Sequence, residues 1–223
     1  MATVLITGCD RGLGEEFAQQ YASKGDRVIA TCLHPEQLSA RRQFGSNVEI
    51  VRLDVTDEEA VLRLAGDLQG QKIDILINNA GIPGPHHLLQ QTDIQLWRRM
   101  LEVNLIAPFV VSHAFVEHVA RSEQKVIAFI SSRMGSISLN NTGSSYAYRS
   151  SKAGLNMVMK NFAIDLGPRQ ICVIGIHPGK VAAAGESGLS VAASVERMRS
   201  VIEESGPHQT GAFYNYNGQI LPW

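Results

Sequence analysis

A tyrosine and a lysine four positions apart form the most informative pair in this sequence. They are Tyr148 and Lys152, within a segment of helical pattern, and this spacing places both side chains on one helix face, one turn apart. An ammonium near a phenol favours the phenolate and lowers its pKa from about 10. Such a tyrosine could exchange a proton near neutral pH. Two unrelated surface residues would show the same spacing, so the upstream sequence must decide.

Three glycines follow the first apolar run of the chain and open the next helical segment. Glycine lets the backbone turn tightly and approach a pyrophosphate closely, and a helix N-terminus offers free N–H groups to a phosphate. The alternative is a glycine-rich turn without a ligand, but its place after the first strand favours a dinucleotide. The candidate cofactor-binding residues here are Gly8, Asp10, Arg11, Gly12, Leu13 and Gly14.

Short apolar runs alternate with longer segments of helical period along the whole chain. The expected strands are Thr3–Thr7, Arg27–Thr31, Val48–Arg52, Ile73–Ile77, Lys125–Ile130 and Ile171–Ile176, with an edge strand within Gly211–Tyr216. The expected helices are Gly12–Lys24, Pro35–Phe44, Asp57–Leu68, Asp93–Arg121, Ser145–Leu166 and Ala192–Glu203. Uniformly apolar strands suit a parallel sheet buried on both faces. The alternation predicts an α/β fold: a Rossmann-type, doubly wound parallel sheet in three α/β/α layers.

Composition narrows the class of protein further. The chain has 223 residues, 44% of them hydrophobic, and a net charge of -1, which predicts one folded domain and no nucleic-acid partner. We see no apolar stretch of about 18 residues and no signal peptide, so we expect no membrane span and a cytoplasmic protein. Three scattered cysteines suit a reducing compartment. His86 and His87 have no evident third ligand, so we expect no metal site.

The glycine spacing and the Tyr148–Lys152 pair together resemble the short-chain dehydrogenase/reductase family over essentially the whole length. The resemblance implies a single domain, residues 1–223, with a cofactor half of about 1–130 and a catalytic half of about 131–223. It also implies cofactor contacts beyond the glycine loop. These fall on Asp54, Val55, Asn79, Ala80, Gly81, Tyr148, Lys152, Pro178, Gly179 and Val181.

The resemblance implies a catalytic set of Ser132, Tyr148, Lys152 and Asn104. Ser132 fits the family's Ser-x-x-Gly frame through Gly135, and Ser131 is the alternative. Ser132 stands 16 residues before Tyr148, a longer gap than most members have, and the extra residues fall in the polar segment Ser138–Ser145. Sniffer-type carbonyl reductases have a similar longer loop and a similar C-terminal end.

These roles describe a reversible hydride transfer between a nicotinamide and a carbonyl or alcohol. The implied roles are proton transfer by Tyr148 and a stabilising hydrogen bond from Ser132. Lys152 would hold the nicotinamide ribose and lower the pKa of Tyr148. Asn104 would hold a water molecule that joins Lys152 to solvent; its alternative is a buried structural amide.

The end of the second strand bears on which nicotinamide is bound. Cys32 stands where NAD-binding members carry an acid, and Arg11 stands where NADP-binding members carry a base. An arginine pairs well with a phosphate, so we favour NADP(H), with NAD(H) left open. Leu33 stands where sniffer-type enzymes tend to have an arginine, and His34 is a possible replacement.

The family resemblance leaves alternatives of function open. Ala183 stands where most members have a threonine that contacts the carboxamide, and the following loop, Gly185–Val191, is short. One alternative is a regulatory or signalling protein that binds the nucleotide with little turnover, because fold alone does not fix function. Another is an NAD-dependent alcohol dehydrogenase. The expected partner is a small carbonyl or alcohol, and a homodimer or homotetramer is possible; the sequence does not name the substrate, the direction or the stereochemistry.

Overall fold

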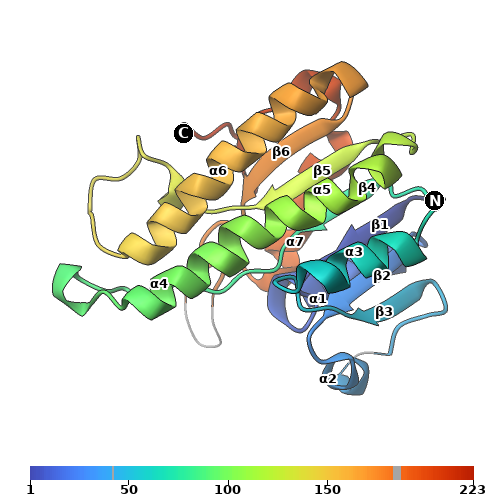
Figure 1. The fold of residues 1–223 in the computed structure, drawn as a ribbon, viewed down its shortest axis with the longest axis horizontal. Coiled ribbons are helices and arrows are strands. Elements are labelled where there is room, and N and C mark those ends of the chain that lie inside the picture. The colour runs from blue at the N-terminus through green and yellow to red at the C-terminus, as the bar shows by residue number, and fades with distance from the viewer. Residues whose placement is uncertain (42, 183–186) are drawn as a thin grey trace.

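A computed structural model describes residues 1–41, 43–182 and 187–223, and shows one α/β domain (Figure 1). Seven parallel strands form its sheet in the order β3-β2-β1-β4-β5-β6-β7. The strands are β1 (Thr3–Ile6), β2 (Arg27–Cys32), β3 (Val48–Arg52), β4 (Ile75–Asn78), β5 (Val126–Ile130), β6 (Cys172–His177) and β7 (Phe213–Asn215). The strand order reverses between β1 and β4, which confirms the doubly wound prediction.

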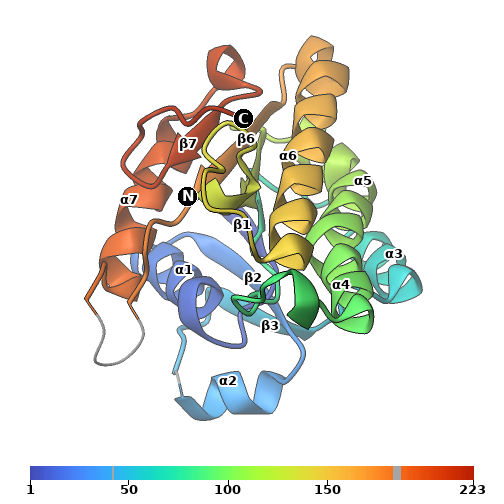
Figure 2. The same cartoon turned by 90° about the vertical axis from the view of Figure 1, so that its left-hand side faces the viewer.

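Helices cover both faces of the sheet (Figure 2). Their buried side chains form one hydrophobic core on each face. On one face α1 and α7 pack on the strands; on the other face α3, α5 and α6 do so. The helices are α1 (Gly12–Ser23), α2 (Pro35–Arg41), α3 (Glu58–Asp67), α4 (Ile94–Leu101), α5 (Ala107–Ala120), α6 (Tyr146–Leu166) and α7 (Val191–Glu204). Val4 and Ile6 point into the first core and Leu5 into the second, as the two-residue period of a strand requires.

The helix expected over Asp93–Arg121 is interrupted. Between α4 and α5 lies a π-helical turn, Glu102–Ile106. Pro108 in the first turn of α5 has no N–H, so it cannot donate to the carbonyl of Asn104 four residues earlier. A π-helical turn tolerates such a lost bond and is frequent at functional sites. The interruption bears on the site because it contains Asn104.

The helical run Ile94–Ala120 is long and apolar enough to cross a membrane by length and composition alone, with half of its best window buried inside the domain. It is the one described helical run that passes this test, although we saw no apolar stretch of about 18 residues in the sequence and expected no membrane span. It is weak evidence for a span, because the buried core helix of a globular domain passes equally. The packing of Val111 and Phe115 in the second core accounts for the apolar character.

The carboxyl ends of β1 and β4 are tied together by side-chain hydrogen bonds. The Thr7 hydroxyl oxygen accepts from the backbone N–H groups of Asn79 and Ala80, each at 3.1 Å. The Asn79 amide donates to the carbonyls of Thr7 at 2.9 Å and Gly8 at 3.0 Å. These bonds fix the point where the strand order reverses, which is where open α/β sheets bind their ligands.

Thr7→Val should lower the free energy of unfolding by about 2 kcal/mol, because it leaves the Ala80 N–H without an acceptor and leaves the Asn79 N–H with only the Ile77 carbonyl, at 3.0 Å. Thr31→Val is the matched control: its buried hydroxyl donates one 3.3 Å bond to the Ile6 carbonyl, so its loss should be smaller. Urea titrations of both variants measure the difference. Equal losses would contradict the role given to Thr7.

Candidate cofactor and catalytic site

The glycine loop brings three backbone segments closer together than side chains would allow. A Cβ atom on Gly14 would lie 2.2 Å from the Gly8 carbonyl oxygen, and one on Gly8 would lie 2.7 Å from the Ala80 Cα. Gly12 has a φ of +63° and open space where its Cβ would be. The loop is therefore closed against the protein at Gly8 and Gly14 and open outward at Gly12, which fits a pyrophosphate above it.

The start of α1 also suits an anion. Helices α3, α4 and α7 begin at Asp57, Asp93 and Ser190, whose side chains accept hydrogen bonds from the first turn. Helix α1 begins at Arg11 and has no such side-chain cap. Its first N–H groups and its positive dipole end are thus available to a ligand phosphate. The residues present fit a dinucleotide cofactor.

Next to this loop, the end of β2 is held by a carboxylate. Asp10 Oδ1 accepts from the backbone N–H groups of Leu33 at 2.9 Å and His34 at 3.0 Å. Cys32 is buried, whereas Arg11 is exposed. The guanidinium is therefore the available charge at this end of the loop. His34 lies 3.5 Å from Glu36 and is exposed.

The adjacent strand ends contribute the remaining predicted cofactor positions. Asp54 accepts from the Thr56 N–H at 2.9 Å and its hydroxyl at 2.7 Å. Burial raises the pKa of Asp54, but these bonds outweigh it and the pKa falls below its ordinary value. Val55 packs against the second core and Leu13 against the first. Asp54 therefore stabilises the turn before helix α3 through Thr56, and the residue that caps this helix is Asp57.

Pro178, Gly179 and Val181 follow β6 at the same edge of the sheet. The Pro178 carbonyl accepts from Ser194 at 2.6 Å, and Gly179 adopts a φ of +79° with Tyr216 where a Cβ would lie. Val181 lines a cavity beside Ser132 and Tyr148. The prediction for Ala183 and the first part of the Gly185–Val191 loop falls outside the described residues.

The two candidate serines at the end of β5 face different surroundings. Ser131 donates to Asn156 Oδ1 at 2.6 Å in the interior. Ser132 accepts from the Met134 N–H at 3.2 Å and lines the cavity beside Tyr148, with which it shares a hydrogen bond. Successive side chains at a strand end point to opposite sides, so only Ser132 lies where a substrate could meet it.

The electrostatics of Tyr148 and Lys152 differ from the sequence expectation. Burial raises the pKa of Tyr148, and the bond with Ser132 offsets this only in part. The Lys152 ammonium donates to the Ile130 carbonyl at 2.9 Å and lies 6.0 Å from the Tyr148 ring centroid. Burial lowers the pKa of Lys152 to about 8. The net pKa of Tyr148 therefore lies above its ordinary value, whereas the sequence led us to expect a lowered one.

Asn104 is fully buried, and its amide joins three elements. Its Nδ2 donates to the Ile82 carbonyl at 3.0 Å and to the Ser151 hydroxyl at 3.2 Å, and its Oδ1 accepts from the Ile82 N–H at 2.8 Å. Both N–H groups are used, and Oδ1 keeps a second lone pair. A Cβ on Gly81 would meet both Asn104 Oδ1 and Lys152 Nζ. Asn104 therefore anchors the loop after β4 and faces Lys152 across Gly81.

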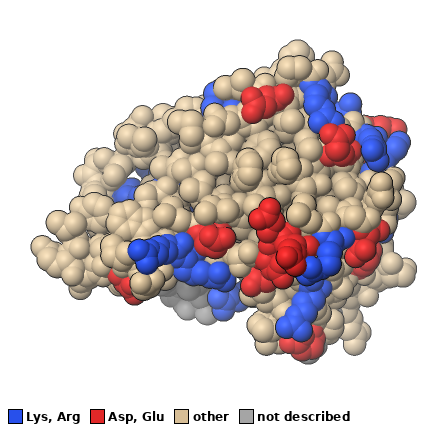
Figure 3. All heavy atoms as spheres, in the orientation of Figure 1, with Lys and Arg blue, Asp and Glu red and all other residues tan. Residues whose placement is uncertain are grey.

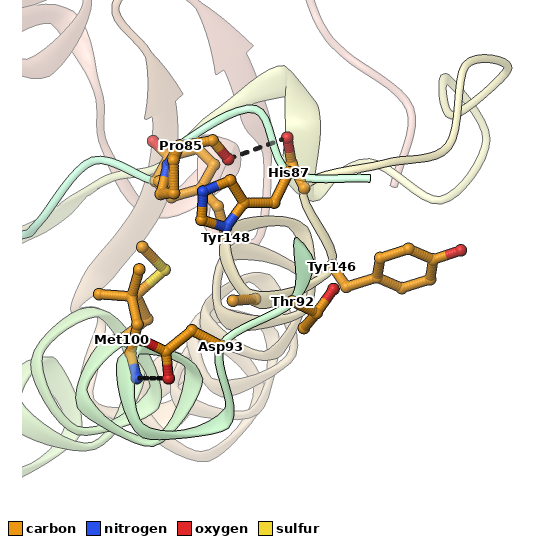
Figure 4. A pocket seen from close by; sticks show the side chains of 11 residues that line it. Pro85, His87, Thr92, Asp93, Met100, Tyr146 and Tyr148 are labelled. Atoms are coloured by element: carbon orange, nitrogen blue, oxygen red, sulfur yellow. Dashed lines mark hydrogen bonds between the residues drawn. The ribbon is translucent and has the colours of Figure 1, made fainter. Parts of the chain in front are cut away.

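The loop after β4 crosses directly over the catalytic helix (Figure 4). A Cβ on Gly84 would lie 2.4 Å from Tyr148 Cβ, and Ser145 donates its N–H to the His87 carbonyl at 2.9 Å. Tyr146 is 41% exposed and points away from the small cavity beneath this loop (Figure 4). His86 contacts Ser144 at 3.1 Å, and the described residues contain no group of three or more side chains suited to a metal ion.

A larger cavity of about 530 Å³ opens in front of Ser132 and Tyr148. Sequence reasoning assigned no role to three polar side chains that line it: Arg133, His177 and Lys180. Each adjoins a motif that was recognised, the serine or the Pro178–Gly179 turn, but only the fold shows that they converge. Burial first, and then the Arg133 charge, lower the pKa of His177 to about 4.

Known proteins resemble this chain both in sequence and in structure. A family model described as short chain dehydrogenase matches residues 2–192. The protein named C-signal of Myxococcus xanthus is 34% identical over 154 residues, covering 68% of this chain and 93% of its own.

Several similar solved structures cover the entire chain, including those of two carbonyl reductases. The carbonyl reductase Sniffer of D. melanogaster is 30% identical, with a TM-score of 0.89 and full coverage of both chains. An NADPH-bound carbonyl reductase from chicken fatty liver is 28% identical, with a TM-score of 0.88 and 94% of its own chain covered. These similarities confirm the predicted fold and the predicted resemblance to sniffer-type reductases.

The buried Lys152 predicts a measurable dependence of stability on pH. Its pKa is about 8 in the folded protein against an ordinary 10.5, so the unfolded chain binds more protons between these values, and stability rises with pH there. The shift is worth about 3 kcal/mol. Relative to Lys152→Met, the wild type should therefore gain up to about this amount between pH 8 and 10.5.

Urea midpoints of the cofactor-free proteins measure this gain. Lys72→Met is the control, because it removes the charge of an exposed lysine and should leave the pH dependence unchanged. A difference between wild type and Lys152→Met that stays constant with pH would show that Lys152 is not desolvated.

Proposed function

This chain belongs to the short-chain dehydrogenase family of oxidoreductases, and on that premise we propose that it is an NADP(H)-dependent carbonyl reductase. One observation carries the proposal. Ser132 and Tyr148 share a hydrogen bond at the wall of one cavity, with the buried Lys152 one helical turn behind. This arrangement suits the reduction of a carbonyl, because it gathers a proton donor, a second hydrogen-bond donor and a buried cation around one reacting position.

The cofactor would lie along the carboxyl edge of the sheet. Gly8, Gly12, Gly14 and the start of α1 would hold its pyrophosphate. Arg11 supports the choice of NADP(H), because an exposed guanidinium stands beside the loop and Cys32 presents no carboxylate to repel a phosphate. Asp54, Val55 and the Asn79–Gly81 turn would border the adenine and ribose, and Pro178–Val181 the nicotinamide. When bound, the cofactor supplies the hydride.

Tyr148 acts as the general acid. Its raised pKa keeps the hydroxyl protonated at neutral pH, which suits donation of a proton to a carbonyl oxygen. Ser132 donates a hydrogen bond to the same oxygen and stabilises the negative charge that grows on it. At neutral pH Tyr148 is protonated, which is the form that can give a proton to a carbonyl oxygen. The two donors therefore favour reduction of a carbonyl over oxidation of an alcohol.

Lys152 stabilises the phenolate that Tyr148 leaves behind. Below its pKa of about 8 the ammonium is mostly charged, and its distance from the Tyr148 ring is short enough for attraction in a dry interior. Asn104 and Gly81 would place a water molecule beside Lys152 to return the proton from solvent. In that relay Asn104 uses its remaining Oδ1 lone pair and also positions the loop that covers Tyr148.

One observation favours the second candidate function, a nucleotide-binding signalling protein with little turnover. It is the similarity to the protein that bears the name C-signal. A signalling role requires the glycine loop but not the pair of Ser132 and Tyr148. The variants below therefore separate the two functions, since only the reductase depends on the Tyr148 hydroxyl.

We propose a homodimer contact on the face of α5 and α6. Figure 3 shows few charged side chains over this part of the surface, and Ile106, Phe109, Met157 and Ile164 are exposed there. Exposed apolar side chains gathered on neighbouring helices commonly mark a protein interface.

Tyr148→Phe should reduce turnover of an aldehyde by about 10²–10⁴-fold, because it removes the proton donor and keeps the ring. The dissociation constant of NADPH should stay unchanged, which separates catalysis from cofactor binding. Tyr146→Phe is the matched control and should keep full activity. Near-normal turnover of Tyr148→Phe would refute the role of Tyr148, and absence of turnover in the wild type, with tight NADPH binding, would support the signalling function.

Arg11→Ala should weaken NADPH binding by about tenfold or more and change NADH binding little, because it removes a charged partner of the additional phosphate. Arg27→Ala is the control, since that arginine pairs with Glu49 at the opposite end of β2. Fluorescence titrations with both cofactors measure the effect. Tighter binding of NADH than of NADPH by the wild type would overturn the preference.

A further inference from the structure

Two positive side chains in the reaction cavity have no partner of opposite charge among the described residues. Arg133 and Lys180 both line the cavity that contains Ser132 and Tyr148. The ion pairs of the described residues include neither of them, and no described residue that lines the cavity is an aspartate or a glutamate. Other arginines, such as Arg63, Arg169 and Arg199, are paired with glutamates.

The surroundings of these two charges are shaped for a ligand with an apolar body. Pro83, Met134, Val181 and Leu221 provide apolar walls. Tyr216 provides an aromatic face, and Arg197 stacks on its ring at 5.5 Å from the centroid, which adds a third positive charge behind the wall.

The positive charge of Arg133 affects the pKa of His177, another residue that lines the cavity. Its Nδ1 atom is buried without a hydrogen-bond partner. Burial and the charge of Arg133 keep the ring neutral at physiological pH. A neutral imidazole adds no positive charge of its own and can exchange a hydrogen bond with a polar group of the substrate. Among the described residues that line the cavity there are thus one side chain with an unsatisfied polar atom and two cations without an ion-pair partner.

We propose that the substrate is a carbonyl compound with a carboxylate group, which Arg133 and Lys180 bind while its carbonyl lies between Ser132 and Tyr148. This inference rests on the proposed reductase function and adds the class of substrate. Arg133 directly follows Ser132 in the chain, so we expect only a short apolar body between the carboxylate and the reacting carbonyl. A guanidinium matches a carboxylate in a two-point contact, and an ammonium adds a point charge.

The test compares 4-carboxybenzaldehyde with methyl 4-formylbenzoate, which present the same ring and aldehyde with and without a negative charge. With NADPH, the wild type should show a higher kcat/KM for the acid than for the ester. Arg133→Gln should lower the ratio of these two kcat/KM values by about tenfold or more through KM, the size expected for one charge-assisted hydrogen bond. Lys180→Gln should lower it less.

Arg169→Gln is the matched control, because this arginine follows the far end of α6 and pairs with Glu117. It removes the same charge and should leave both rates and their ratio unchanged. The dissociation constant of NADPH is measured for every variant. A loss of NADPH affinity in Arg133→Gln that matches the loss of kcat/KM for both substrates would assign the arginine to the cofactor and overturn the proposal.

Failure of this inference is distinct from failure of the reductase function. Reduction of the ester at a rate equal to or above that of the acid would refute carboxylate binding and leave the reductase intact. If neither aldehyde is reduced, calorimetry with the NADPH-bound protein decides. Binding of 4-(hydroxymethyl)benzoate that exceeds binding of its methyl ester and weakens in Arg133→Gln would support the anion site, and equal binding would refute it.

Discussion

The close approach of the first and fourth strand ends is the constraint on which the site depends. Gly8 and Gly14 have no room for a Cβ against each other and against Ala80, and the Asn79 amide bonds to the carbonyls of Thr7 and Gly8. Because parallel strands have their carboxyl ends at the same edge, this contact sets the start of α1 beside the loop that follows β4. That same loop then crosses Tyr148 at Gly84. The cofactor cradle and the catalytic helix therefore share one support.

The buried polar groups on the catalytic side are held by backbone atoms rather than by opposite charges. Lys152 donates to the Ile130 carbonyl, and Asn104 bonds both polar groups of the Ile82 backbone. An ammonium in a dry interior loses part of its preference for the charged form, which is why the pKa of Lys152 falls to about 8. The π-helical turn at Glu102–Ile106 brings Asn104 to this position. A local departure from α-helical geometry thus serves the arrangement around Lys152.

Sequence reasoning predicted the order of strands and helices well, because apolar, β-branched runs and helical periods are local signals. It placed the edge strand within Gly211–Tyr216, where β7 lies. It missed the π-helical turn, although Pro108 marked it, since a proline in the first turn of a helix is common. It also expected a lowered pKa for Tyr148, whereas burial raises it; how deeply a helix residue is buried depends on the packing of the whole fold, which no local pattern encodes. The convergence of Arg133 and Lys180 likewise requires the fold.

The long gap between Ser132 and Tyr148 shows how an insertion is accommodated without moving the reacting groups. Arg149, beside Tyr148, donates to the Gly143 carbonyl at 3.0 Å, the Thr142 hydroxyl at 2.8 Å and the Met134 carbonyl at 3.4 Å. The extra loop is thereby tied to the first turn of α6. At its other end the Ser136 hydroxyl bonds to the carbonyls of Pro222 and Trp223. Because both ends are anchored, the added residues extend outward, and the serine and the tyrosine keep their contact.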